Sequence, residues 1–176
     1  LLSTIESEKI KLNSKTPIAV KISPDIEDDI IEKTSEILLK YNVAAAIISN
    51  STDVNRENLK NVNKFEKGGL SGKPLENKSN VLINKFYKNL KNKIKIIGVG
   101  GVDSGKSAFE KIINGASLVQ LYTGMVYKGP NIAFKISDEL SDILEKKGIK
   151  NISEAIGIKK WSWLATLERL YSHKFY

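Results

Sequence analysis

The sequence alternates short apolar runs with longer segments in which apolar positions recur at helical spacing. This alternation predicts repeated strand–helix units around a parallel sheet. The expected strands are residues 18–22, 43–49, 94–99 and 118–122, and the expected helices are residues 26–41, 77–91, 104–113 and 130–147. Four such units make half of an eight-stranded (β/α)8 barrel or a small open doubly wound sheet. Periodicity alone leaves both architectures possible.

Polar residues interrupt the first of these units at two places. Lys21 puts a charge inside the first apolar run, where it must be compensated or must point toward an anion. The trio Ser23, Pro24 and Asp25 is similar to a helix cap, so we expect it to open the helix of residues 26–41.

Two later segments depart from the regular alternation. Residues 50–75 contain three glycines, Gly68, Gly69 and Gly72, and are longer than most strand-to-helix loops, which is typical of a segment with a function. Residues 161–176 (WSWLATLERLYSHKFY) place large apolar side chains on one helical face. This pattern predicts an amphipathic helix that forms a separate tail.

Composition places the chain among globular proteins, with 176 residues that are 41% hydrophobic and 27% charged. No apolar run approaches the ~20 residues of a transmembrane helix, and the first residues lack the regions of a signal peptide, so we expect a soluble chain. The absence of cysteine excludes disulfides and thiolate chemistry. The chain opens on Leu1 and its only methionine is Met125, so we expect a piece of a longer protein.

The net charge of +8 raises the alternative of a nucleic-acid-binding module. The stretch KFYKNLKNKIK concentrates lysines around two aromatic residues, and Lys85, Lys88 and Lys91 would carry the binding. Lysines are also spread along the whole chain and mixed with acids. A solvated helix face is therefore the favoured interpretation of this stretch.

Residues 100–107, GGVDSGKS, fit the phosphate-binding pattern G-x-x-x-x-G-K-[ST] and raise a second alternative, a P-loop nucleotide hydrolase. In such proteins the glycine-rich backbone faces the phosphates, the lysine adds charge and the hydroxyl holds magnesium. Such a protein also needs an apolar strand that ends in an acid to help bind magnesium. None of the expected strands ends in this way, and the pattern follows the third strand instead of the first.

The same glycines fit a different phosphate site. In (β/α)8 barrels, the loops after strands seven and eight commonly bind a phosphate together with a helix N-terminus. Gly100 and Gly101 end one expected strand here, and residues 122–124 (Tyr-Thr-Gly) end the next. If these are strands seven and eight, Asp103 and Lys106 are exposed residues at the start of a helix and the P-loop match is accidental.

Six motifs in order, VKISPD, IISNST, GGLSGKPL, IIGVGGVDSGKSAFEKIINGASLVQLYTG, YKGP and EAIG, closely resemble the C-terminal half of dihydroorotate dehydrogenase, in its membrane-associated, quinone-reducing class. The resemblance covers roughly residues 16–160. It implies an α/β fold, a TIM-type (β/α)8 barrel that binds FMN, of which this chain supplies strands five to eight. Residues 1–160 would form this half-barrel and residues 161–176 an atypical tail.

The resemblance also assigns roles to individual residues. Lys21 matches a flavin-contacting lysine, whose ammonium beside the N1/O2 edge would favour negative charge on the ring. Asn50 and Ser51 match the pair that binds the pyrimidine ring of the substrate, for which an amide offers both a donor and an acceptor. The other flavin contacts implied are Ser49, Gly72, Gly101, Tyr122 and Thr123, the last three at the phosphate.

The implied parent enzyme oxidises dihydroorotate to orotate in pyrimidine synthesis and passes the electrons to a quinone. The catalytic base, the quinone tunnel and the membrane attachment would all lie upstream of Leu1, so we expect no catalytic base in this chain and no activity from it alone. The parent would be peripheral on the cytoplasmic face of the inner membrane. The resemblance implies neither a metal nor a nucleic-acid partner.

Overall fold

The structure is a computed structural model that describes residues 1–54, 56–57, 59–90 and 92–159. Its strands are β1 (Ala19–Ile22), β2 (Ala45–Ile48), β3 (Lys95–Val99) and β4 (Leu118–Gln120). All neighbouring pairs are parallel and the order is β1-β2-β3-β4. This order is that of consecutive strands in a (β/α)8 barrel, and it lacks the reversal that defines a doubly wound sheet.

The helices that cover the sheet lie where the apolar periodicity predicts them. They are α2 (Asp28–Lys40), α3 (Glu76–Leu90), α4 (Gly105–Ile113) and α6 (Ile132–Lys146). Short 3₁₀ turns occur at Val62–Phe65, Lys73–Leu75 and Ile152–Ala155. The amphipathic helix expected at residues 161–176 lies outside the described residues.

Two helices are absent from the sequence-based expectation. α1 (Leu2–Lys11) buries none of its residues, so it has no apolar face of the kind that the periodicity detects. α5 (Thr123–Lys128) has six residues, which is too few for a recurring pattern.

The main hydrophobic core lies between the sheet and helices α2 and α3. Phe86 and Leu90 of α3 are fully buried, and they belong to one cluster with Ile48 of β2 and Ile96 of β3. A second set of apolar contacts joins α4 to α6 through Phe109 and its neighbours. The helices are therefore fixed to one face of the sheet, which places the strand ends accurately.

Within the part of the chain that the structure describes, the opposite face of the sheet is exposed or only half-buried. The strand register aligns Lys21, Ile47, Ile97 and Leu118 in one row across the four strands. Ile47 and Ile97 are only half-buried, and Leu118 is 63% exposed. In a closed barrel this row would point into the interior.

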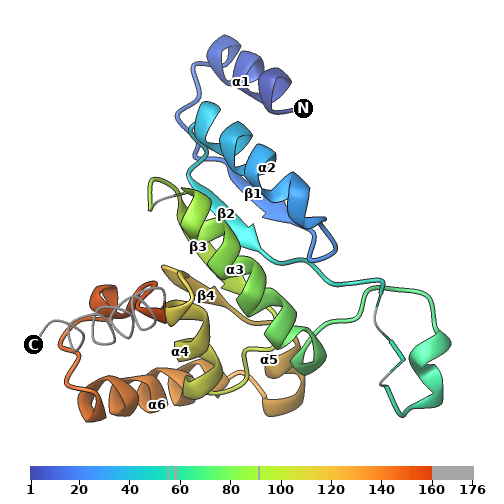
Figure 1. Cartoon of the computed structure of the whole chain (residues 1–176), viewed down its shortest axis with the longest axis vertical. Helices are drawn as coiled ribbons and strands as arrows, with labels where there is room; N and C mark the ends of the chain where they lie inside the picture. The colour runs from blue at the N-terminus through green and yellow to red at the C-terminus, as the bar shows by residue number, and fades with distance from the viewer. Residues whose placement is uncertain (55, 58, 91, 160–176) are drawn as a thin grey trace, which may run out of the picture.

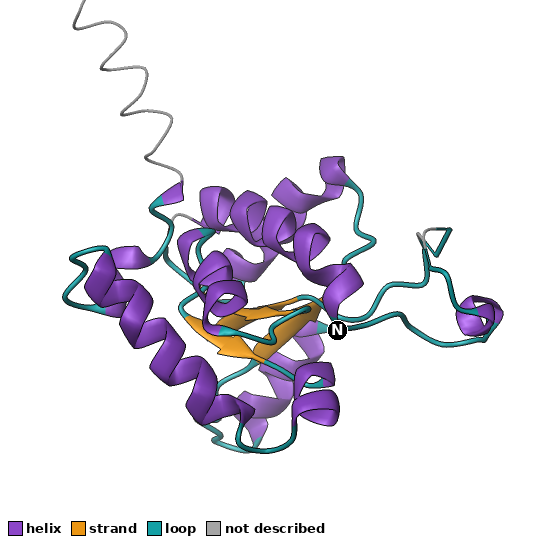
Figure 2. Cartoon of the chain, turned by 90° about the horizontal axis from the view of Figure 1, so that it is seen from below, coloured by secondary structure: helices purple, strands orange, loops and turns teal. Residues whose placement is uncertain are grey.

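The carboxyl ends of the strands and the long loop lie on the same side of the molecule (Figure 1). The arrowheads of β1 and β2 point to the side where residues 50–75 leave the body, and α1 lies beyond the opposite end. In Figure 2 the strands lie together in the centre with helices around them. No helix among the described residues is both long enough and apolar enough to cross a bilayer.

The expectation that Ser23, Pro24 and Asp25 cap the first predicted helix is wrong. The N-cap of α2 is Glu27, and no side chain caps it. The Asp25 carboxylate instead accepts a hydrogen bond from the Thr52 hydroxyl at 2.5 Å. Asp25 thus joins two loops, because its partner lies beyond the next strand.

Candidate functional site

A single pocket collects all the residues that the sequence assigns to flavin or substrate binding. It has a volume of about 290 Å³ and lies at the carboxyl ends of the strands. Its lining includes Lys21, Ser49, Asn50, Ser51, Gly72, Gly101, Tyr122 and Thr123. The fold brings these residues together from four strands and the long loop, and their individual roles stay predictions.

Backbone hydrogen bonds from neighbouring strands hold the pocket residues that follow β2. The Ser49 N–H donates to the Val99 carbonyl at 3.1 Å, and the Asn50 N–H donates to the Ile22 carbonyl at 2.9 Å. Ser49 is buried, whereas Asn50 is exposed. The continued β1–β2–β3 pairing therefore fixes the backbone and leaves the Asn50 side chain available.

The opposite end of the pocket is formed largely by backbone. Gly72 and Gly101 both have a φ of +76°, which favours glycine. A Cβ on Gly72 would lie 2.8 Å from Thr123 Cγ2, and one on Gly101 would lie 2.4 Å from Glu76 Cβ. The Ser71 and Thr123 hydroxyls share a hydrogen bond of 2.9 Å. The three loops thus pack too closely for a side chain at either glycine.

Backbone donors at this end suit an anion. The first hydrogen bond within α5 runs from the Met125 N–H to the Tyr122 carbonyl, so the Thr123 and Gly124 amides precede it. Amides at a helix start carry partial positive charge and readily bind phosphate. Thr123 and Gly124 both line the pocket.

Several lining residues were not found from the sequence. Ser71, Leu75, Val99, Val102 and Leu121 complete the walls. Ser71 stands inside the motif GGLSGKPL, which is the one signal that could have drawn attention to it. The apolar residues are indistinguishable in sequence from ordinary core positions.

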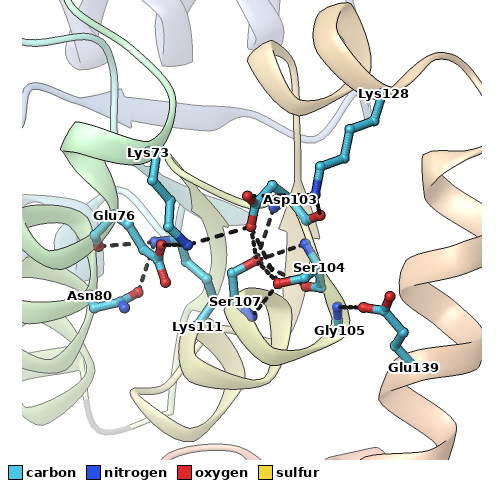
Figure 3. A network of polar contacts seen from close by, with 10 residues as sticks. All are labelled: Lys73, Glu76, Asn80, Asp103, Ser104, Gly105, Ser107, Lys111, Lys128 and Glu139. Carbon is cyan, nitrogen blue, oxygen red and sulfur yellow. Dashed lines mark hydrogen bonds and ion pairs between the residues drawn. The ribbon is translucent and has the colours of Figure 1, made fainter.

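The P-loop-like segment uses its polar groups within the protein (Figure 3). Ser104 is the N-cap of α4 and forms a capping box with Ser107. The Ser107 hydroxyl accepts hydrogen bonds from the Asp103 and Ser104 amides at 2.9 and 3.0 Å, and it is 1% exposed. A P-loop would need this hydroxyl to bind magnesium, so the geometry does not support a nucleotide hydrolase.

A carboxylate occupies the place that a phosphate would take at the start of α4. The Gly105 N–H donates to Glu139 Oε2 at 2.6 Å (Figure 3). Lys106, the lysine of the pattern, is exposed. The N-terminus of α4 favours a negative charge, and the Glu139 carboxylate of α6 supplies it.

Asp103 differs from the expectation of an exposed residue. Its side chain is 31% exposed and lies 3.5 Å from the Lys73 ammonium and 3.7 Å from that of Lys128. Burial alone would raise the pKa of Asp103. The two ammonium groups and the Ser107 and Ser104 hydroxyls lower the pKa by more than burial raises it, so the net shift is downward. Asp103 therefore links the loop after β3 to the turn at Lys73 and to the end of α5, beside the Gly101 end of the pocket (Figure 3).

Lys111 holds α4 against α3 behind this end of the pocket. Its ammonium is fully buried and donates to Asn80 Oδ1 at 2.7 Å and to the Glu76 carbonyl at 3.3 Å (Figure 3). Glu76 in turn is the residue that packs against Gly101. Burial lowers the pKa of Lys111 to about 8.

The lysine-rich stretch does not present a uniform basic surface. Lys85 donates to both carboxylate oxygens of Asp28 at 2.6 Å, so its charge is paired, whereas Lys88 is exposed. Lys91 lies outside the described residues. The described part of the stretch gives the nucleic-acid alternative no support.

A larger hollow, of about 760 Å³, lies at the other end of the sheet. Residues that precede strands, such as Ile18 and Ala44, line it together with α1. Ligand sites in parallel α/β proteins lie at the carboxyl ends of strands, and the amino-terminal face of a barrel serves stability. The smaller pocket is therefore the candidate site.

Comparisons with known proteins identify the family to which the chain belongs. The sequence model of the family described as dihydroorotate dehydrogenase matches residues 2–144. A relative from Trichodesmium erythraeum, named dihydroorotate dehydrogenase (quinone), is 40% identical over 82% of this chain and 40% of its own length. One of the same name from Wigglesworthia glossinidia brevipalpis is 48% identical over 77% of this chain and 42% of its own length.

The structural comparison gives the same result. The crystal structure of the enzyme from Eimeria tenella in complex with ferulenol matches with a TM-score of 0.85 and 33% identity, over 90% of this chain and 47% of that one. The chain spans about two fifths of the length of these curated relatives. It supplies about half of a TIM-type (β/α)8 barrel, and it belongs to the dihydroorotate dehydrogenase family.

Proposed function

We propose that this chain forms the FMN- and substrate-binding side of a quinone-dependent dihydroorotate dehydrogenase, which oxidises dihydroorotate to orotate. The observation that carries the proposal is the pocket, which gathers residues from four successive strand ends and the long loop. Membership of the family supplies the reaction class, since relatives of the same family bear the name dihydroorotate dehydrogenase (quinone).

The residues present fit FMN. Gly101, Tyr122 and Thr123 would hold the phosphate through backbone amides, and Gly72 would let the backbone approach the flavin, in a cradle where glycine backbone comes close to its neighbours. Ser49 would contact the flavin with its hydroxyl. When bound, FMN would supply the hydride acceptor for the substrate and the carrier of electrons to the quinone.

Lys21 would stabilise charge on the flavin, and Asn50 would recognise the substrate. The Lys21 ammonium is exposed on the inner face and lines the pocket, where it would stabilise negative charge at the ring edge. Asn50 would pair with the alternating donors and acceptors of the pyrimidine, and Ser51 would add a hydroxyl. Together they orient the substrate for hydride transfer.

Other functions would come from the part of the parent enzyme that this chain does not cover. These are the catalytic base, the quinone site and the attachment of the parent enzyme to the cytoplasmic face of the inner membrane. Residues 1–160 would belong to the barrel and residues 161–176 would form a separate tail.

The test uses a completed barrel: this chain co-expressed with the part of the Trichodesmium erythraeum relative that it does not match. Lys21→Ala should slow flavin reduction by dihydroorotate ~10²–10³-fold, because removing a preorganised electrostatic contact typically costs that much. Stopped-flow absorbance of the flavin measures this rate.

Lys106→Ala is the matched control, since Lys106 is also an exposed lysine but lies outside the pocket lining. It should change FMN affinity and the reduction rate by less than about fivefold, as a surface charge contributes at most about 1 kcal/mol. Loss of FMN binding in Lys106→Ala, with Lys21→Ala unaffected, would overturn the assigned phosphate site.

A further inference from the structure

One carboxylate, that of Asp25, joins three segments that are far apart in the sequence. Asp25 Oδ1 accepts hydrogen bonds from the Thr52 hydroxyl at 2.5 Å and from the Lys78 ammonium. Asp25 Oδ2 accepts from the Asp53 backbone N–H at 3.2 Å. The loop after β1, the loop after β2 and helix α3 therefore meet at this side chain.

Thr52 is the point through which Asp25 reaches the pocket. Thr52 is 3% exposed and exchanges two backbone hydrogen bonds with Leu70, at 3.0 and 2.7 Å. This bridge closes the base of the long loop. The neighbouring Gly69 packs against Ser51, because a Cβ built on Gly69 would lie 2.0 Å from Ser51 Oγ.

The two proposed substrate residues directly precede this anchor. Asn50 is fixed from one side by its hydrogen bond to the last residue of β1, Ile22, at 2.9 Å. Thr52 is fixed from the other side by Asp25. Neither Asp25 nor Thr52 lines the pocket, so Asp25 can act on a ligand only indirectly, through the segment that it holds at Thr52 and Asp53.

The negative charge of Asp25 suits this arrangement of donors. Burial alone would raise the pKa of Asp25. Hydrogen bonds from Lys78, Thr52 and the Asp53 amide lower the pKa by more than burial raises it, so it lies below its usual value. The ionised carboxylate accepts all three hydrogen bonds at once. An uncharged side chain at position 25 would leave the buried Thr52 hydroxyl without its charged acceptor.

We propose that Asp25 is a positioning residue for substrate recognition, which holds Asn50 and Ser51 in their binding geometry through Thr52. The inference rests on the proposed function, which assigns these two residues to the substrate. It predicts that loss of the Asp25–Thr52 contact weakens substrate binding while FMN stays bound, because the proposed flavin contacts at Gly101 and Thr123 come from other loops.

The first experiment measures steady-state kinetics and FMN content of the completed barrel. Asp25→Ala should raise the KM for dihydroorotate about 10- to 100-fold, the range for a hydrogen bond to a charged group, with a smaller change in kcat. Thr52→Val should have a similar effect, the double variant should add little, and Thr52→Ser, which keeps the hydroxyl, should restore most of the affinity.

Asp28→Ala is the matched control. Asp28 also pairs with a lysine of α3, Lys85 at 2.6 Å, but its side chain is 78% exposed and it bonds no pocket loop. It should leave KM within about twofold of the wild type. Equal KM values for the Asp25→Ala variant and the wild type, or full affinity in Thr52→Val, would overturn the proposal.

The second experiment needs no activity. In the chain itself, Asp25→Ala should speed hydrogen–deuterium exchange at the Thr52 and Leu70 amides and leave the amides of β2 and β3 protected. Unchanged protection of Thr52 and Leu70 would contradict the positioning role. If the wild-type completed barrel is inactive but the exchange result holds, the proposed function fails and the Asp25 anchor of the loop stands.

Discussion

Lys111 is the residue at which charge and burial conflict most clearly. Its side chain is fully buried between α3 and α4, with the Asn80 amide oxygen and the Glu76 carbonyl as acceptors. Burial lowers its pKa to about 8, against a usual value of 10.5. The amine therefore loses its proton at lower pH in the folded chain than in the unfolded chain.

The lowered pKa of Lys111 makes the folded chain more stable, relative to the unfolded chain, as the pH rises. Between about pH 8 and pH 10.5 the unfolded state keeps a proton that the folded state has released, so stability rises with pH by up to about 1.4 kcal/mol per unit. Urea unfolding of the wild type and of Lys111→Met from pH 7 to pH 10 should show the wild type gaining stability relative to the variant. Lys106→Met is the control, and parallel curves for wild type and Lys111→Met would contradict the account.

The site residues divide into those that the sequence could identify and those that it could not. Lys21 could be identified, because a charge inside an apolar strand is anomalous and its motif resembles a known family. Asp25 was misread as a helix cap, because its partner Thr52 lies 27 residues away. A hydrogen bond across that separation leaves no local pattern, so only the fold reveals it.

Helix α4 shows how a P-loop pattern can serve as a helix start. Ser104 and Ser107 cap the first turn, and Glu139 of α6 accepts from the Gly105 N–H at 2.6 Å. A carboxylate at this position accepts a hydrogen bond from an amide that has no partner within the helix. Its negative charge also interacts favourably with the positive end of the helix dipole. It joins α4 to α6 in addition to their apolar contacts.

Removal of this carboxylate should destabilise the chain. Glu139→Ala should lower the free energy of unfolding by about 0.5–2 kcal/mol, as the loss of a capping side chain typically does. Urea unfolding measures the change, and Asp142→Ala, an exposed acid of the same helix, should have a smaller effect. Equal effects of the two substitutions would show that Glu139 acts only as a surface charge.

The sequence predicted the strands and helices that have a repeating apolar pattern and missed the two helices that lack one. The four strands and helices α2, α3, α4 and α6 follow from apolar periodicity, because each buries a face in a shared core. α1 buries no residue and α5 is short, so neither leaves that signature. Sequential strand order required the resemblance, since periodicity alone left the open sheet possible.

In the described part of the molecule, helices cover one face of the sheet and leave the other face exposed or half-buried. β1 and β4 are at the two ends of the strand order, so each leaves one edge without a neighbour among the described residues. The row from Lys21 to Leu118 is exposed or half-buried on the inner face. Unpaired edges and an apolar face favour association, and the remaining strands of a barrel would cover both.

We propose that this chain supplies the flavin and substrate side of the barrel and depends on the rest of the parent enzyme for catalysis. The most direct test is the rate of dihydroorotate oxidation with a quinone acceptor, measured for this chain alone, for the complementing part of the Trichodesmium erythraeum relative alone, and for the two co-expressed. The account predicts oxidation only by the co-expressed pair, in a yellow complex that contains FMN. Oxidation by the chain alone at a rate comparable to that of the pair would contradict it, as would a flavin-loaded pair that leaves dihydroorotate unchanged.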